Sequence, residues 1–214
     1  MNESKRDDNS FWSAESPLAS LACTGLLVVA SGRLAFALVA GTSLVVVYLA
    51  TILALWAGRP LLTDRIRGAV SVLAASFFAS VFFLLVSLLS PILAEESAFY
   101  LALGPVVFVA SGMANRCARD SLSVSAIRAA AESLSILALL IGFALIREPL
   151  AYGGLSMPGK DGLAGIGGSG EVSPFALRAA SSTIGGLILA AYAIFAFRAL
   201  RERLSDRGVE REDS

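Results

Sequence analysis

Two long stretches of this sequence carry no charged residue, and they constrain the fold more than any other feature. Leu34–Trp56 contains 23 residues and Ala69–Leu93 contains 25, all of them uncharged. An α-helix needs roughly 20 apolar residues to cross the hydrocarbon of a bilayer. Of the 214 residues, 56% are hydrophobic and only 16% are charged, and a soluble chain of this size has no core large enough to bury so much apolar surface. The sequence therefore predicts an all-α integral membrane protein.

Six apolar segments are expected to cross the membrane or enter it. In chain order they are about Leu18–Gly32, Leu34–Trp56, Ala69–Leu93, Phe99–Ala114, about Ile127–Ile146 and Phe175–Phe197. The first and fourth are too short for a full crossing, so each is expected to be a short or broken helix. Unpaired backbone at that depth persists only where protein covers it. Residues 1–16 and 201–214 are expected to form polar tails. A signal peptide is the alternative interpretation of the first apolar run.

The two short segments resemble each other. Leu21–Gly32 and Leu101–Gly112 lie 80 positions apart and share six identical residues. Interrupted apolar segments at matching places in two halves are typical of membrane proteins with inverted repeats. The alternative is chance similarity between helices rich in Ala, Val and Leu. We predict two inverted three-helix repeats, residues 17–93 and 94–200. The second contains a Gly-rich external loop, 149–174, which is expected to be too rich in glycine to form strands.

The basic residues predict an orientation for the six segments. With the N-terminus inside, 13 of the 17 Lys and Arg residues lie on the cytoplasmic side, and the other four are Arg33, Arg147, Lys160 and Arg178. Such an excess marks the cytoplasmic loops of membrane proteins. Both termini are therefore expected in the cytoplasm. The net charge is zero, so the overall charge gives no sign of a nucleic-acid partner.

The residue types present limit the chemistry. There is no histidine, which excludes His-based zinc and haem sites and His-based catalytic triads. Cys23 and Cys117 are the two cysteines, too few for a disulfide framework. Arg128 and Glu132 are spaced as an i, i+4 pair, for which a surface ion pair is a more ordinary role than a site in an ion pathway. We predict no catalytic residue in this chain.

Several short motifs recur in an order and spacing that resemble a known family. Cys23 lies in Leu-Ala-Cys-Thr-Gly-Leu-Leu, Pro105 is followed six residues later by Ser111 and five beyond that by Arg116, Arg147-Glu148 precedes Gly153 near the end of the fifth segment, and Ser-Pro-Phe opens the sixth at 173–175. From residue 18 to about 203 the chain resembles the small six-helix membrane subunits of the Rnf complex and of the sodium-pumping NADH:quinone reductase. The E subunit of the Rnf complex and its D-type counterpart in the reductase resemble it more closely.

That resemblance implies a role in electron transport. Two such subunits pair, and each supplies two cysteines to one 2Fe-2S cluster at mid-membrane, which relays electrons between flavin-bearing subunits while sodium or protons move. Cys23 is then the candidate iron ligand, and Ser111 stands at the second cysteine position of the family. Cys117 lies six residues further on, about 9 Å along a helix, too far to replace it. A serine oxygen is a harder and weaker iron ligand than a thiolate.

Three interpretations follow from this departure. The cluster is kept with serine or with an incomplete ligand set; the cluster is lost but the subunit still builds the complex; or the chain is a divergent, transporter-like or structural relative. By resemblance, the chain is expected to be a subunit of a ferredoxin:NAD or NADH:quinone oxidoreductase, not catalytic alone, in a bacterial inner membrane. Its expected partners are a homologous six-helix subunit, other subunits of the complex and membrane lipid.

Overall fold

The computed structural model describes residues 21–114, 121–159, 162–166 and 178–192 of the protein. Its elements in chain order are α1 (Leu21–Ala30), α2 (Leu34–Ala57), the short 3-10 helix η2 (Arg59–Leu61), α3 (Asp64–Leu89), α4 (Pro91–Ala110), α6 (Leu122–Tyr152), β1 (Leu155–Gly159), β2 (Gly162–Ile166) and α7 (Arg178–Ser181). An apolar helix, Thr183–Tyr192, follows α7. The expected tails, 1–16 and 201–214, lie outside the described residues, as do Arg116 and Cys117.

Four helices of the described chain are long and apolar enough to cross a membrane. They are α2, Arg65–Leu89 of α3, α4 and α6. On α3, large apolar side chains face outward: Leu73 is 70% exposed, Phe77 62% and Leu88 83%. Surfaces of this kind are stable against lipid and rare on soluble monomers. The helical architecture and these exposed apolar faces indicate a membrane protein, as the sequence predicts.

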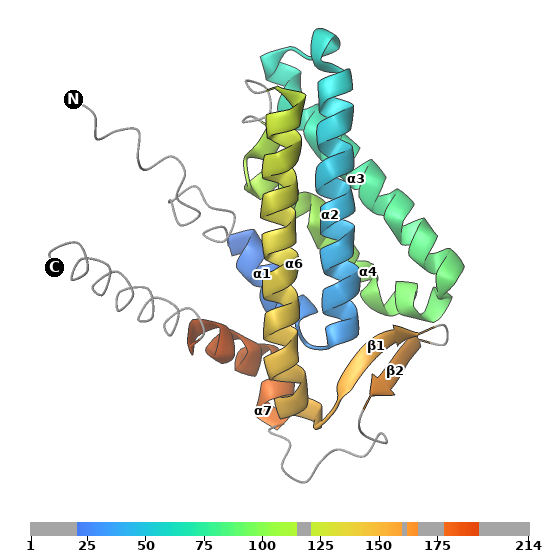
Figure 1. The fold of residues 1–214 in the computed structure, drawn as a ribbon, viewed down its shortest axis with the longest axis vertical. Coiled ribbons are helices and arrows are strands. Elements are labelled where there is room, and N and C mark those ends of the chain that lie inside the picture. Colours follow the sequence, from blue (N-terminus) through green and yellow to red (C-terminus); the bar gives the residue numbers. More distant parts are fainter. Residues whose placement is uncertain (1–20, 115–120, 160–161, 167–177, 193–214) are drawn as a thin grey trace, which may run out of the picture.

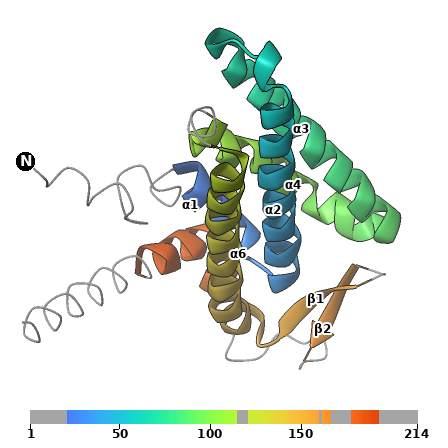
Figure 2. The same ribbon diagram turned by 45° about the horizontal axis from the view of Figure 1, so that its top comes forward.

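The centre of the bundle is the pair α2 and α6, which run antiparallel and in close contact (Figures 1 and 2). Gly41 makes this contact possible, because a Cβ placed there would lie only 2.2 Å from Cδ1 of Leu137 on α6. On its other side α2 packs against α4, where the rings of Tyr48 and Phe108 meet edge to face at 5.0 Å. The Tyr48 hydroxyl donates to the Val107 carbonyl at 3.4 Å. The buried hydroxyl of Tyr48 therefore has a hydrogen-bond partner within the core.

The junction between α3 and α4 corrects two sequence predictions. The third apolar segment was expected to continue to Leu93, but α3 ends at Leu89 and a single residue, Ser90, separates it from α4. The Ser90 hydroxyl accepts from the Leu93 amide at 3.3 Å, and Pro91 occupies the first turn, where its missing N–H is not needed. α4 therefore has 20 residues. The prediction that the fourth segment is too short to cross is wrong on length.

The end of α6 and the segment after it also differ from expectation. α6 continues through Pro149 to Tyr152 and stops at Gly153, whose φ of 75° is left-handed. The predicted loop 149–174 therefore begins as helix. Within it β1 and β2 form an antiparallel hairpin, so the prediction that this region is too rich in glycine for strands is wrong. Strand pairing uses backbone groups only, and Gly162, with φ of 104°, adopts the turn conformation that other residues resist.

The hairpin marks one end of the bundle. The N-terminus of α2, the C-terminus of α6 and the C-terminus of α1 all lie at this end (Figure 1), which we call the hairpin end. β1 contacts α2, and β2 contacts the beginning of α4. The opposite end holds η2, the start of α3 and the start of α6 (Figures 1 and 2).

Candidate functional site

Cys23 and Ser111 are both buried where α1 packs against α4. Cys23 is 3% exposed and Ser111 7%. Cys23 belongs to the same buried core as Val107, Phe108 and Met113. The first two precede Ser111 in the sequence and the third follows it, and α1 contacts α4. Neither side chain faces the lipid. Since α1 rises about 1.5 Å per residue, Cys23 lies roughly 10 Å inward from the end of α1 at Ala30.

The donor groups at this position do not fit the two-thiolate half-site that the family resemblance implies. The Ser111 hydroxyl donates to the Phe108 carbonyl at 2.7 Å and accepts from the Met113 amide at 3.3 Å. These two bonds close the C-terminal end of α4, just before Gly112 turns the chain with φ of 66°. Cys23 therefore offers the thiol of this position, while the Ser111 oxygen is engaged as a helix cap. Among the described residues, no three His, Cys, Asp or Glu side chains gather as a metal site.

Arg147, in the last turns of α6, connects the ends of two other helices at the hairpin end of the bundle. Its side chain is 3% exposed. Nε donates to the Ala180 carbonyl at 2.9 Å and Nη2 to the Ser182 carbonyl at 2.9 Å. Nη1 donates to the Val28 carbonyl and to the Ser31 hydroxyl, the latter at 3.2 Å. The last carbonyl groups of a helix have no partner within it, so this one guanidinium satisfies carbonyl groups at the ends of α1 and α7.

Glu148, the next residue, does the complementary task at the beginning of α2. It is 2% exposed, and its Oε2 accepts from the Leu34 amide at 2.7 Å. Leu34 is the first residue of α2, and the first amides of a helix lack partners and carry partial positive charge. The two motif residues therefore bring a buried cation to helix C-termini and a buried anion to a helix N-terminus. The sequence had placed this pair near the end of the fifth apolar segment, without indicating which groups it binds.

The helix Thr183–Tyr192 approaches Arg147 closely because it carries glycine at the contact. A Cβ at Gly186 would lie 2.7 Å from Cζ of Arg147 and 2.8 Å from both Nη atoms. No real Cβ tolerates that separation. Gly186 is the second residue of a Gly-Gly pair at 185–186. The helix can therefore lie this close to Arg147 only because residue 186 is glycine.

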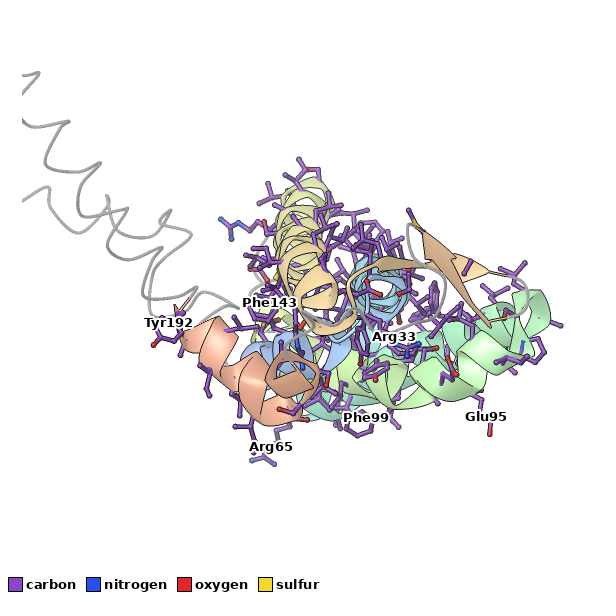
Figure 3. The ribbon with its side chains drawn as sticks, turned by 90° about the horizontal axis from the view of Figure 1, so that it is seen from below. Arg33, Arg65, Glu95, Phe99, Phe143 and Tyr192 are labelled. Carbon is purple, nitrogen blue, oxygen red and sulfur yellow. The ribbon has the colours of Figure 1, made fainter. Side chains whose placement is uncertain are left out.

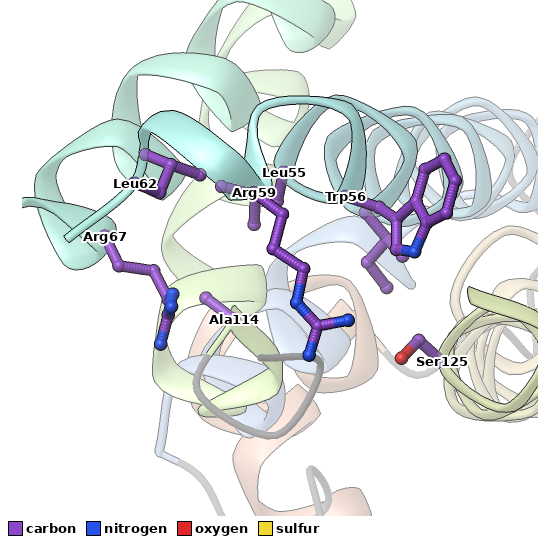
Figure 4. A pocket seen from close by; sticks show the side chains of 8 residues that line it. Leu55, Trp56, Arg59, Leu62, Arg67, Ala114 and Ser125 are labelled. Carbon is purple, nitrogen blue, oxygen red and sulfur yellow. The ribbon is translucent and has the colours of Figure 1, made fainter. Parts of the chain in front are cut away.

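At the opposite end, one arginine from η2 and one from α3 flank the chain just after α4 (Figure 4). Arg59 and Arg67 line a small cavity of about 20 Å³ together with Ala114, Trp56 and Ser125. That volume holds about one water molecule. Both copies of the repeated apolar segment thus end beside arginine: the copy in α1 beside Arg147, and the copy in α4 beside Arg59 and Arg67.

Three further residues singled out in the sequence have structural positions. Pro105 lies inside α4 and is buried. Gly153 ends α6, and its amide donates to the Pro149 carbonyl at 2.9 Å. Arg128 is exposed at the start of α6, in keeping with a surface role.

A cavity at the hairpin end was not expected from the sequence. It measures about 190 Å³ and is lined by Arg33, Tyr100, Arg147 and Tyr152 among others. In the sequence, the only signal was that basic and aromatic residues stand together at the ends of apolar segments. Such residues are common at membrane interfaces, so nothing in the pattern distinguished a cavity from an ordinary boundary.

The comparisons with known proteins add no family. No protein-family model, curated protein or solved structure matches the chain. The functional interpretation therefore depends on the motifs and on the geometry described above.

Proposed function

We propose that this chain is a membrane subunit of an Rnf-type ion-translocating electron-transport complex, placed at or beside the mid-membrane iron–sulfur relay. In this role it pairs with a homologous six-helix subunit in a bacterial inner membrane, with both termini in the cytoplasm. The observation that carries the proposal is that Cys23 on α1 and Ser111 at the C-terminal end of α4 are both buried, on two helices that contact each other. These are the two positions at which the family, by resemblance, places its ligands.

The motif Arg147-Glu148 supports the same proposal. The resemblance singles out these two residues, and both are buried at a junction of helix ends. The pair forms hydrogen bonds with backbone groups that lipid cannot satisfy. A helix as short as α1 requires such a partner, because its C-terminal carbonyls end inside the bundle.

The arrangement of arginines at both ends supports the inverted repeat that the proposal includes. α1 ends at the hairpin end beside Arg147, which belongs to α6. α4 runs the other way and leads to the opposite end, beside Arg59 at the end of α2. In a six-helix inverted repeat these are equivalent relations: the first helix of each half ends against the second helix of the other half.

A second function is favoured by one specific observation. The hydroxyl of Ser111 is engaged in closing α4, so the position has the form of a helix cap and lacks a second thiolate. A chain that kept the fold and lost electron transfer, as a structural or transporter-like membrane protein, would have this arrangement. The two functions differ in partners, and that difference can be measured.

The deciding experiment is purification of the tagged full-length chain from its own membranes in a mild detergent. If the chain is a subunit of the complex, mass spectrometry identifies a homologous six-helix protein and flavin-bearing subunits in stoichiometric amounts. A chain that purifies alone, from membranes in which those proteins are present, rejects the first function and leaves the second.

Iron and acid-labile sulfide in the same preparation separate the interpretations of Cys23. Cys23→Ala removes the thiol and replaces it with another small residue in a buried helix. If Cys23 binds iron, this variant loses iron while the complex remains assembled. Equal iron content in both preparations assigns the chain a place beside the relay without ligation.

A further inference from the structure

The cavity at the hairpin end has a positive lining. It lies between the α1–α2 junction, α4, the last turns of α6 and the beginning of the Thr183–Tyr192 helix. Its volume of about 190 Å³ is far larger than the roughly 10–15 Å³ that one water molecule needs. Two guanidinium groups, those of Arg33 and Arg147, line it. Seen from this end, Arg33 lies among the helix ends, whereas Glu95 projects away from the bundle (Figure 3).

No carboxylate of the described residues lines this cavity. Glu148 is nearby, but its Oε2 binds the Leu34 amide at 2.7 Å. Arg147 already donates hydrogen bonds to the carbonyls of Ala180 and Ser182. Arg33 differs: its guanidinium lies over the Tyr152 ring, 5.2 Å from the centroid, and no described acceptor binds it. A half-buried cation without an anion is unfavourable, so the cavity favours a negatively charged occupant.

Further donors are available at the same place. Tyr100 and Tyr152 line the cavity, and within the described residues neither hydroxyl has a hydrogen-bond partner. The N-terminus of α2, which begins at Leu34, adds partial positive charge. Guanidinium groups and phenol hydroxyls are strong donors to phosphate oxygens.

We propose that this cavity is a binding site for a phosphate group, with Arg33 as its main cationic contact and the hydroxyls of Tyr100 and Tyr152 as additional donors. The proposal does not depend on membership of an electron-transport complex. It depends on the cavity, on the Arg33 guanidinium, which binds no acceptor among the described residues, and on the hydroxyls of Tyr100 and Tyr152, which have no partner among them.

The location indicates two sources for the phosphate. The cavity lies at the ends of the apolar helices α2 and α6, beside the rings of Phe36 and Tyr100, which are tilted by 36° with centroids 5.1 Å apart. Aromatic side chains at helix ends mark the level of lipid headgroups. The phosphate can thus be that of an anionic lipid, or it can be soluble phosphate entering from water.

The test uses the purified full-length chain and three probes. Native mass spectrometry and thermal unfolding are measured with phosphatidylglycerol, with phosphatidylcholine and with inorganic phosphate. Phosphatidylcholine carries a phosphate without net negative charge and is the matched lipid. Preferential retention of phosphatidylglycerol identifies a lipid headgroup site, and stabilisation by inorganic phosphate alone identifies a site for soluble phosphate. If neither phosphatidylglycerol nor inorganic phosphate binds, the proposal is wrong.

Two variants test the residues, and a third serves as the control. Arg33→Gln removes the main cation of the cavity and is expected to weaken phosphate or phosphatidylglycerol binding roughly 10- to 100-fold, the effect of one charge-assisted hydrogen bond. Tyr152→Phe keeps the ring beneath Arg33 and removes only a hydroxyl, so it decides the question if Arg33→Gln does not fold. Arg65→Gln removes an exposed cation at the start of α3, which lies at the opposite end (Figure 1). If Arg33→Gln and Tyr152→Phe bind as Arg65→Gln does, the proposal is wrong.

Discussion

Replacing Gly186 with alanine tests the closest helix contact at the hairpin end. The added Cβ would lie 2.7 Å from Cζ of Arg147, about 0.7 Å nearer than ordinary van der Waals contact. Arg147 has little freedom to move, because its guanidinium is held by carbonyls of α1 and of residues 180–182. Either the Thr183–Tyr192 helix moves outward or Arg147 gives up hydrogen bonds.

The expected cost can be estimated from these two responses. Overpacking in a well-packed interior costs about 1–3 kcal/mol. Each hydrogen bond that Arg147 loses adds roughly 1.5–3 kcal/mol, because the donor is charged. Alanine recovers up to about 1 kcal/mol through its higher helix propensity. We expect a net loss of about 2–4 kcal/mol in the free energy of unfolding.

The matched control is Gly142→Ala on α6. A Cβ at Gly142 meets nothing within 4 Å, so this variant reports helix propensity without a clash and should be neutral or up to about 1 kcal/mol more stable. Equilibrium unfolding in detergent micelles, followed by tryptophan fluorescence, measures both. If Gly186→Ala is as stable as Gly142→Ala, the close approach to Arg147 does not exist.

A double-mutant cycle makes the same test at the level of the pair. Lysine at position 147 has a smaller head group than arginine and leaves room for the new Cβ. The penalty of Gly186→Ala should therefore be smaller in the Arg147→Lys background, with a coupling of roughly 0.5–3 kcal/mol. Strict additivity would place the origin of the penalty elsewhere.

Three other substitutions have defined outcomes. Glu148→Gln keeps an oxygen for the Leu34 amide but removes the negative charge at the N-terminus of α2, and it should lower the free energy of unfolding by about 1–3 kcal/mol. Gly41→Leu should separate α2 from α6 at Leu137 and destabilise by at least about 1–3 kcal/mol, measured in the same way. Ser90→Ala removes the cap of α4, should cost about 1 kcal/mol, and should speed hydrogen exchange of the first amides of α4.

Each of these variants has a control elsewhere in the chain. Glu95→Gln removes an exposed carboxylate, Gly142→Leu adds the same side chain where there is open space, and Ser80→Ala removes an exposed hydroxyl within α3. A test variant that behaves as its control does would contradict the contact assigned to that residue.

The apolar helices could be predicted from the sequence, because the period and length of uncharged runs are local properties. The bounds of α2 were predicted to within one residue, since Arg33 and Gly58 flank the run. The junction at Ser90-Pro91 was missed although its signal is local: serine before proline is a typical helix start. The uncharged run through these residues was interpreted as one continuous helix, and Glu95 as loop, because length was given more weight than capping.

The site was less predictable, because its contacts are not local. Arg147 binds the Val28 carbonyl, 119 residues away in the sequence, and no periodicity indicates which backbone carbonyls a buried arginine will meet. The hairpin was not predicted for a related reason. Because β1 and β2 pair through backbone groups, their side-chain pattern gives little information on whether they form strands. The roles of Cys23 and Ser111 as ligands stay predictions.

The long sequence separations at Arg147 have a consequence for how the chain is made. The carbonyls at the end of α1 leave the ribosome well before the arginine that will bind them, and that arginine is synthesised before Ala180 and Ser182. Contacts this distant form late. Until then, the nascent protein holds a charged side chain and open backbone groups at the membrane, which is costly. The link between the end of α1 and residues 180–182 is complete only when nearly all of the described chain has been made. A chain shortened before residue 182 should therefore be a substrate for membrane proteases.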